Sequence, residues 1–277
     1  MGFDLHVHTT ASDGTFTPSE IVRLAVQTGL KGIAITDHDT LDGIEEAKAA
    51  AGRHSGFEVI SGIELNTDAG EREVHILGYL LDWHHAGLAA RLAEIKTARE
   101  NRAQKMVEKL REMGYQIEYE RVRSLAQGDI VARPHVAQAL LEKGYIQTMR
   151  EAFDQLIGLG RPAYVKRYKF LPEEAIALIR DAGGVPVLAH PGLIGDPGVV
   201  RKMIDLGISG LEVYYPEHRA DEEAIFLEIA REHRLVITGG SDFHGQGGDM
   251  QRLGLVQVDS AHITALKACK KALEAQP

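Results

Sequence analysis

Hydrophobic and polar positions follow two different periods along the chain. Short apolar runs of strand length recur, and apolar positions at helical spacing separate most of them. The apolar runs are 3–7, 32–36, 57–63, 75–81, 184–189, 208–215, 235–240 and 253–258. Thr17, Pro18 and Glu20 form a capping-box pattern with proline at the first helical position, which marks a helix start. This alternation predicts a parallel sheet, either open or closed into a barrel.

The middle of the chain has a different pattern. Residues 87–160 show helical periodicity without a strand-like run, and residues 87–114 predict one long helix. The apolar stripe of this helix contains Leu88, Leu92, Ile95, Met106 and Leu110. We therefore expect an α/β body made of residues 1–86 and 161–277, interrupted by an all-helical insertion made of residues 87–160.

Composition and charge narrow the possible partners. The chain is 44% hydrophobic and 26% charged with a formal net charge of −9, which argues against general binding of duplex nucleic acid. An anionic substrate must then be bound locally, by metal ions or by clustered basic side chains. Met1 leads almost directly into the first apolar run without a signal-peptide pattern, and no run is long enough to cross a membrane. The single Cys269 excludes an internal disulfide, so we expect a cytoplasmic protein, of undetermined oligomeric state.

Histidines and carboxylates stand at the ends of successive apolar runs. His6 and His8 lie two apart in the first run, so on a strand their side chains point to the same face. Ligands of parallel α/β folds bind at the carboxyl ends of the strands. Imidazole and carboxylate groups suit zinc, manganese and iron. The candidate metal ligands are His6, His8, Asp13, His38, Glu64, His75, His190, Asp242 and His244.

A single residue of these types would mean little. A lone histidine in a strand is usually a satisfied core residue, and a lone aspartate before a helix is usually a cap. Nine such residues at successive strand ends predict a metal site instead. One zinc ion takes about four ligands, so this set predicts a cluster of two or three ions, which suits phosphoryl chemistry. Asp37 and Asp39 are expected to support the site or cap helices, Glu212 is expected to be structural, and His218 stays undecided.

Four segments in chain order carry a family resemblance. They are "DLHVHTTASDG" (4–14), "TDHD" (36–39), "AHP" (189–191) and "SDFH" (241–244). Together they resemble the motifs of the PHP (polymerase and histidinol phosphatase) family, over nearly the whole chain. The resemblance implies a distorted seven-stranded (β/α) barrel with a trinuclear metal centre.

The same resemblance implies a ligand set for each ion. One ion is expected to bind His6, His8, Glu64 and Asp242. A second is expected to bind Glu64, His75 and His190, which makes Glu64 a bridging ligand, and a third to bind Asp13, His38 and His244. We also expect Asp13, His38 and His244 to take part in catalysis.

Two arginines interrupt the apolar stripe of the long helix. A buried charge is costly unless it is paired, so Arg99 and Arg102 either reach solvent or a glutamate, or bind a phosphate as planar forks. Basic groups also stand in two other places. One is a helix start, where anions bind well, and the other is the segment in which the insertion returns to the α/β body. The candidate substrate-binding residues are Arg99, Arg102, Arg133, His135, Arg161 and Lys166.

Within the PHP family, the helical insertion and "ARPHVAQAL" (132–140) resemble nucleoside 3',5'-bisphosphate phosphatases and 5'-3' exoribonucleases. The expected activity is hydrolysis of the 3'-phosphate of nucleoside 3',5'-bisphosphates, and of short 5'-phosphorylated oligoribonucleotides, by attack of a metal-bound hydroxide. The expected cofactors are two to three divalent ions, manganese first, with zinc and iron as alternatives. A histidinol-phosphate-type phosphatase is the nearer alternative function. A non-catalytic PHP module is the other, although the full set of nine candidate ligands argues against it.

Overall fold

Seven strands form one mixed sheet in which neighbours in sequence are neighbours in space. The computed structural model describes residues 2–70, 72–126, 131–166, 168–245 and 253–275. The strands are β1 (Phe3–Val7), β2 (Gly32–Ile35), β3 (Glu58–Ala69), β4 (Arg72–Tyr79), β5 (Val185–Leu188), β6 (Gly210–Tyr214) and β7 (Val236–Gly239). The segment after β7 returns to β1, where the backbone N–H of His8 donates to the carbonyl of Phe243 at 2.9 Å. The sheet is thus nearly closed into a barrel, and the predicted distorted seven-stranded α/β barrel is confirmed.

Two features of the sheet differ from the predicted parallel arrangement. Strand β4 runs antiparallel to both β3 and β5, while the other neighbouring strands are parallel. The reason is the short connection between the two strands. Strand β3 ends at Ala69 and β4 begins at Arg72, so there is no room for the crossover helix that a parallel pair requires. Gly70 at φ 74° provides the turn. The predicted strand at 253–258 is also wrong, because only Val258 pairs there, in an isolated bridge with Phe3.

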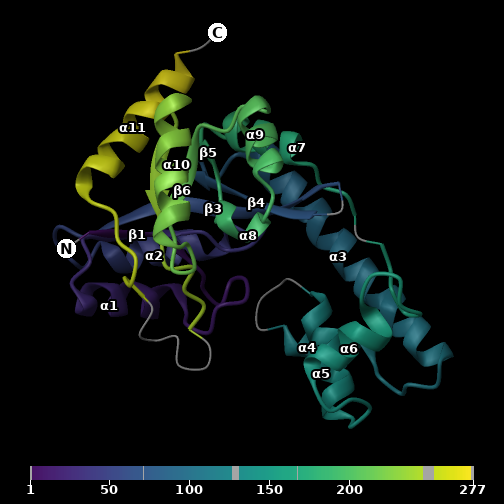
Figure 1. Ribbon diagram of the computed structural model, residues 1–277. Coiled ribbons are helices and arrows are strands. Elements are labelled where there is room, and N and C mark those ends of the chain that lie inside the picture. The colour runs from purple at the N-terminus through teal and green to yellow at the C-terminus, as the bar shows by residue number, and fades with distance from the viewer. Residues whose placement is uncertain (1, 71, 127–130, 167, 246–252, 276–277) are drawn as a thin grey trace. The chain divides into compact units, whose positions relative to one another are not determined.

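Helices surround this sheet. They are α1 (Pro18–Thr28), α2 (Asp42–Ala51), the start of α3 (Ala86–Glu112), α7 (Pro172–Asp181), α8 (Pro191–Ile194), α9 (Pro197–Asp205), α10 (Ala220–Glu232) and α11 (Ser260–Glu274). Helices α1 and α2 pack on each other and on β2 and β3, whereas α10 and α11 pack on β6 and β7 (Figure 1). The predicted start of α1 is confirmed, since the Thr17 hydroxyl accepts from the N–H of Glu20 and the Glu20 carboxylate accepts from the N–H of Thr17.

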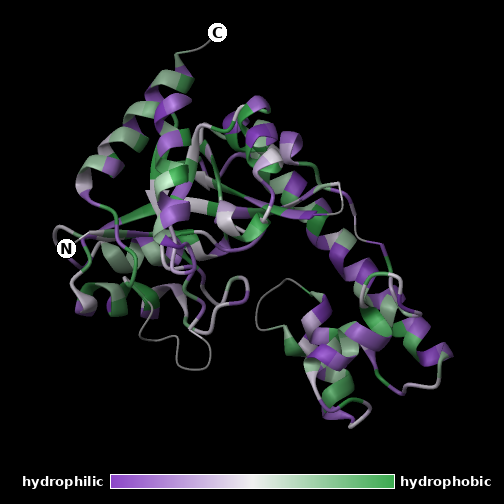
Figure 2. Ribbon diagram, viewed as in Figure 1, coloured by the Kyte–Doolittle hydropathy of each residue, from purple (hydrophilic) through white to green (hydrophobic). Residues whose placement is uncertain are grey.

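Two apolar clusters stabilise this part of the chain. Ile21, Val22 and Ala25 of α1 pack with Ile33 and Ile35 of β2 in one of them, and strands β1 to β5 share the other with α11. The helices carry hydrophobic residues in bands beside hydrophilic ones, as amphipathic helices do (Figure 2). Phe3 and Leu5 of β1 belong to the second cluster. Because side chains alternate along a strand, the opposite face of β1 carries Asp4 and His6.

The chain divides into two units, Met1–Ala90 with Lys169–Pro277, and Arg91–Tyr168. In the second unit the described residues form most of α3, then α4 (Tyr119–Leu125), α5 (Arg133–Glu142), α6 (Met149–Ala152) and the π-helical turn η1 (Phe153–Ile157). The predicted single helix over 87–114 is present as α3, and its apolar stripe is buried. A core of its own, including Leu110, Val122, Leu140 and Ile157, holds this unit together. In the described part of the chain, no helix combines the length and the apolar character needed to span a bilayer.

Candidate metal centre

Glu64 of β3 is the centre of a cluster of imidazoles. Its side chain is 1% exposed and has five histidines around its two oxygens. The Oε2 atom lies 3.1–3.2 Å from nitrogens of His6, His8 and His38, and Oε1 lies 2.7 Å from His75 Nδ1 and 3.0 Å from His190 Nε2. A buried carboxylate with imidazoles around both of its oxygens is suited to bridge two metal ions.

The topology explains why these residues meet. His6 lies on β1, and His190 and Asp242 follow the ends of β5 and β7, so all three stand at the carboxyl edge of parallel strands. His75 stands near the beginning of β4 instead, opposite Asn66 of β3. Because β4 is antiparallel, its beginning lies at the same edge as the ends of the parallel strands. The reversed strand therefore still delivers its histidine to the cluster.

Asp242 is the second carboxylate of the cluster. Its Oδ1 lies 3.3 Å from His6 Nε2 and 3.1 Å from His8 Nε2, and its Oδ2 accepts a hydrogen bond from the Tyr215 hydroxyl at 2.9 Å. Asp242 has φ 52° and His190 has φ 27°, values in the left-handed region that residues other than glycine seldom adopt. Such backbone strain is concentrated at functional sites, where the surrounding structure holds it in place.

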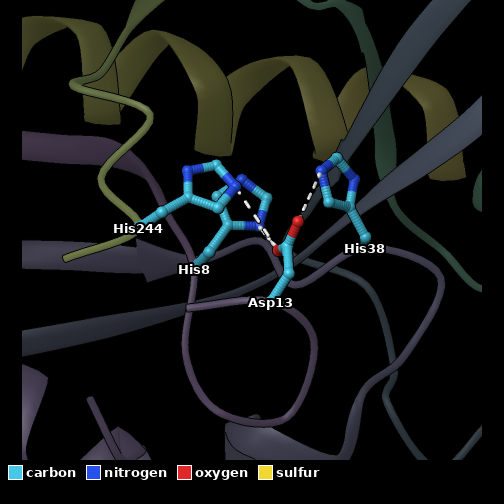
Figure 3. Close-up of side chains that lie close together, drawn as sticks. All are labelled: His8, Asp13, His38 and His244. Atoms are coloured by element: carbon cyan, nitrogen blue, oxygen red, sulfur yellow. Dashed lines mark ion pairs between the residues drawn. The ribbon is translucent and has the colours of Figure 1, made fainter. Parts of the chain in front are cut away.

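Asp13 lies among three of the histidines, namely His8, His38 and His244 (Figure 3). Its Oδ1 lies 3.4 Å from His244 Nε2 and 3.8 Å from His8 Nδ1, and its Oδ2 lies 3.9 Å from His38 Nε2. The three rings are directed at one carboxylate although they come from segments far apart in sequence (Figure 3). Imidazole nitrogens and carboxylate oxygens are ligand atoms that suit divalent cations, so this group is a candidate site for one ion.

The potential metal ligands form three groups, and within each group the ligand atoms all lie within 4.8 Å of one another. They are His8, Asp13, His38 and His244; His6, His8, Glu64 and Asp242; and His38, Glu64 and His75. The second group has the members expected for the first ion. In the third, His38 stands where His190 was expected, although His190 Nε2 contacts the same Glu64 carboxylate. All nine predicted ligands thus lie in one region, and their roles as ligands stay a prediction.

Several buried polar atoms in this region have no hydrogen-bond partner among the described residues. They are both ring nitrogens of His8, Nδ1 of His38, Nδ1 of His190 and Oδ1 of Asp242. An unsatisfied buried polar atom is costly, and native proteins avoid it unless a water or an ion provides the partner. The imidazole and carboxylate donors fit divalent metals, so the cluster indicates a divalent metal site.

The electrostatics of the cluster favour bound cations. Burial alone would raise the pKa of Glu64, yet the imidazoles of His38, His6 and His75 hold that pKa well below its usual range. Burial alone would lower the pKa of His8, but Asp242 and Glu64 raise it to about 10. Without a metal, protons on imidazoles such as that of His8 therefore balance the carboxylates, whereas burial lowers the pKa of His38 to about 4 and leaves that ring neutral. Metal ions that bind here must exchange for those protons.

Other carboxylates hold the ligand-bearing segments. Asp37 accepts hydrogen bonds from the backbone N–H and hydroxyl of Thr9 and from the Ser12 hydroxyl, which fastens the loop leading to Asp13. Asp4 accepts from the N–H and hydroxyl of Ser241, the residue before Asp242.

Two residues in supporting positions, Asp4 and Tyr215, were not identified from the sequence, and Glu212 was expected to be structural but its contact with His6 was not foreseen. An acidic residue inside a strand-length apolar run was the available signal for Asp4 in 3–7 and for Glu212 in 208–215. The Tyr215 hydroxyl, which donates to Asp242, had no such signal.

The six candidate substrate residues all lie in the second unit. Arg102 donates from Nε to the carbonyl of Val165 at 2.8 Å, and Arg133 lies over the ring of Phe153. The Nδ1 atom of His135 accepts from the N–H of Ala132, so this imidazole caps its own helix. Arg99 is partly buried on α3, and the last two candidates, Arg161 and Lys166, are exposed. Their contacts with a substrate stay a prediction.

Comparison with known proteins agrees with this geometry. The PHP domain family model matches residues 4–183. The chain belongs to the PHP family. It is 36% identical over 247 residues to a 5'-3' exoribonuclease of Haemophilus influenzae, covering 87% of this chain and 89% of that protein. It is 35% identical over 260 residues to a 3',5'-nucleoside bisphosphate phosphatase of Chromobacterium violaceum, covering 88% of each.

The fold leads to the same family. A crystal structure of a metal-dependent phosphoesterase, described as putative, from Bifidobacterium adolescentis superposes with a TM-score of 0.82 at 31% identity, covering 97% of this chain and 96% of that one. This PHP protein is therefore an enzyme, a phosphoric ester hydrolase of the phosphatase and exonuclease type.

Proposed function

We propose that this PHP enzyme removes the 3'-phosphate from nucleoside 3',5'-bisphosphates and also degrades short 5'-phosphorylated oligoribonucleotides. The observation that carries the proposal is the buried Glu64 carboxylate with five imidazoles within 3.2 Å. The similarity to a nucleoside bisphosphate phosphatase and to an exoribonuclease, each over most of both chains, supports the nucleotide class. A cytoplasmic location fits such substrates.

The nine candidate ligands would hold two to three divalent ions, with manganese the first choice and zinc or iron as alternatives. Bound divalent ions supply activation of water near neutral pH and neutralisation of phosphate charge. The chain itself supplies the rest. Asp13, His38 and His244, which lie in one group of candidate ligands with His8, are proposed to take part in catalysis. Three residues of α3 and α5, Arg99, Arg102 and Arg133, are proposed to bind a second phosphate with His135.

A substrate panel tests the proposal. We expect a nucleoside 3',5'-bisphosphate to be hydrolysed with a higher kcat/KM than the matching 3'-monophosphate, because only the former offers two phosphates. The panel includes a 5'-phosphorylated ribotrinucleotide and histidinol phosphate, each assayed with added manganese by phosphate release. If histidinol phosphate is the best substrate, the nucleotide proposal is wrong and the alternative phosphatase is supported. If none of these esters is hydrolysed, the proposed substrate class is wrong.

Metal content is a second expected result. Protein purified without chelators and reconstituted with manganese should carry two to three ions per chain, because three groups of ligand atoms are present. Elemental analysis after desalting measures this directly. Fewer than one ion per chain after reconstitution would contradict a metal cluster.

A further inference from the structure

Glu212 is a buried carboxylate in the middle of β6. Its residue is 0% exposed, and it lies within the apolar segment Gly210–Tyr214. The Oε1 atom lies 3.0 Å from Nδ1 of His6, and Oε2 accepts a hydrogen bond from the backbone N–H of His190 at 2.8 Å. A buried carboxylate is costly unless its oxygens are satisfied, and here both oxygens have partners at candidate metal ligands.

The contact with His6 selects the tautomer of that ring. A carboxylate oxygen can only accept a hydrogen bond, so the tautomer that satisfies this contact has its proton on Nδ1 of His6. In the neutral ring the lone pair is then on Nε2, and only a nitrogen with a lone pair can bind a metal ion. The Nε2 atom is the nitrogen that faces Glu64 Oε2 at 3.2 Å and Asp242 Oδ1 at 3.3 Å. Glu212 therefore turns the lone pair of His6 toward the cluster.

The contact with His190 acts on the backbone. His190 has φ 27° and ψ 59°, an unfavourable conformation for a residue with a side chain. The hydrogen bond from its N–H to Glu212 helps to hold this conformation, which leaves His190 Nε2 3.0 Å from Glu64 Oε1. One carboxylate on β6 thus positions two candidate ligands that come from β1 and from the end of β5.

We propose that Glu212 is a positioning residue of the metal centre, which sets the tautomer of His6 and the backbone of His190 without touching a metal itself. The inference rests on the proposed metal centre and adds a residue to it. Carboxylates that accept from the far nitrogen of a metal-bound histidine orient the ring and raise its basicity. Sequence patterns place Glu212 among structural residues, because a single acid in an apolar strand does not show which groups it contacts.

The variant Glu212→Gln tests this role with little change in shape. A side-chain amide has one acceptor oxygen and one donor nitrogen, so it can serve only one of the two contacts. If the oxygen accepts from His190, the NH₂ group faces His6 and forces the other tautomer. If the oxygen accepts from His6, the NH₂ group opposes the N–H of His190. Either arrangement misplaces one ligand, and we expect metal affinity to fall by about 10–100-fold.

Thr238→Val is the matched control. Thr238 of β7 stands directly opposite Glu212 in the sheet register and is also 0% exposed. Its hydroxyl donates to the carbonyl of Leu211 and not to a candidate ligand. Manganese and zinc affinities of the wild type and both variants are measured by competition with a chromophoric chelator. We expect Thr238→Val to bind as tightly as the wild type, whether or not its thermal stability changes.

The outcomes separate this inference from the proposed function. If the wild type binds metal and Glu212→Gln binds within about threefold of it, well short of the expected 10-fold loss, the positioning role is wrong and the metal centre stands. An equal loss in Thr238→Val would also overturn the role, because any buried polar substitution would then suffice. A wild type that binds no metal overturns the proposed function and this inference with it.

A direct measurement covers the case in which Glu212→Gln does not fold. In the zinc-loaded wild type, ¹⁵N-detected spectra of the histidine rings should show a proton on Nδ1 of His6 and none on Nε2. The His6 signals are assigned by their loss in His6→Asn. A proton on Nε2 of His6 would overturn the proposed tautomer, and with it the positioning role.

Discussion

Glu64→Gln should abolish most of the phosphatase activity while the chain still folds. The substitution keeps the shape of the side chain but removes the charge around which five imidazoles are arranged. Divalent ions held by a bridging carboxylate supply several kcal/mol of transition-state charge stabilisation. Since ~1.4 kcal/mol corresponds to a factor of ten, a loss of about 3–5 kcal/mol of it would lower kcat/KM by about two to four decades.

The measurements are kcat/KM on a nucleoside 3',5'-bisphosphate, bound manganese by elemental analysis, and thermal unfolding by circular dichroism. Glu58→Gln is the control, because Glu58 is on the same strand but pairs with Lys267 at the surface. Exposed ion pairs contribute about 0–1 kcal/mol, so this variant should keep its activity and its metal. A Glu64→Gln enzyme with near wild-type turnover and full metal content would show that Glu64 is not a bridging ligand.

The alternation of strands and helices was predictable because apolar periodicity and helix caps are encoded locally, whereas closure into a barrel was implied by the resemblance to the PHP family. Thr17 and Glu20 cap α1 as their spacing indicates, and the long helix follows its own apolar stripe. The direction of β4 is a non-local property. Polar residues such as Asn66 and Asp68 in the second half of β3 hid the continuation of the strand, and so the hairpin was not recognised.

The position of the site was predictable for a similar reason. Strand ends in a barrel converge at one edge, so residues such as His6, His190 and Asp242 could be placed together before any distances were known. The partners of individual atoms could not be predicted. Glu212 contacts His6 and His190, and the Tyr215 hydroxyl donates to Asp242. These contacts depend on the register of β6 and β7 and on side-chain directions, which the periodicity of the sequence does not specify.

The contacts of the second-unit arginines decide which of them gives the clearest test of phosphate binding. Arg102 donates to the carbonyl of Val165 and lies over the ring of Tyr164, so it fastens α3 to the end of the same unit. Arg102→Ala should therefore lower thermal stability in addition to any loss of phosphate binding, so its effect on activity would not isolate a phosphate contact. Arg99 stands one helical turn earlier on the same helix and is partly buried. It is the better choice for testing recognition of a second phosphate.

Arg99→Ala should reduce activity selectively on substrates with two phosphates. A hydrogen bond to a charged group is worth about 1.5–3 kcal/mol. Because ~1.4 kcal/mol is tenfold, kcat/KM for a nucleoside 3',5'-bisphosphate should fall by about one to two decades. The matching 3'-monophosphate never uses this contact, so its kcat/KM should stay nearly unchanged. Arg99→Lys keeps the charge but loses the planar fork, and should fall between the wild type and Arg99→Ala.

Lys105→Ala separates a specific contact from a general effect of charge. Lys105 is an exposed cation on the same helix, so its removal lowers the positive charge of α3 by the same amount as Arg99→Ala. If the helix only attracts anions from a distance, both variants should weaken activity on the bisphosphate alike, and the loss should shrink as salt is added. If Arg99 binds the 5'-phosphate, Lys105→Ala should behave as the wild type. Equal losses for Arg99→Ala on the bisphosphate and the monophosphate would instead mean that Arg99 is structural.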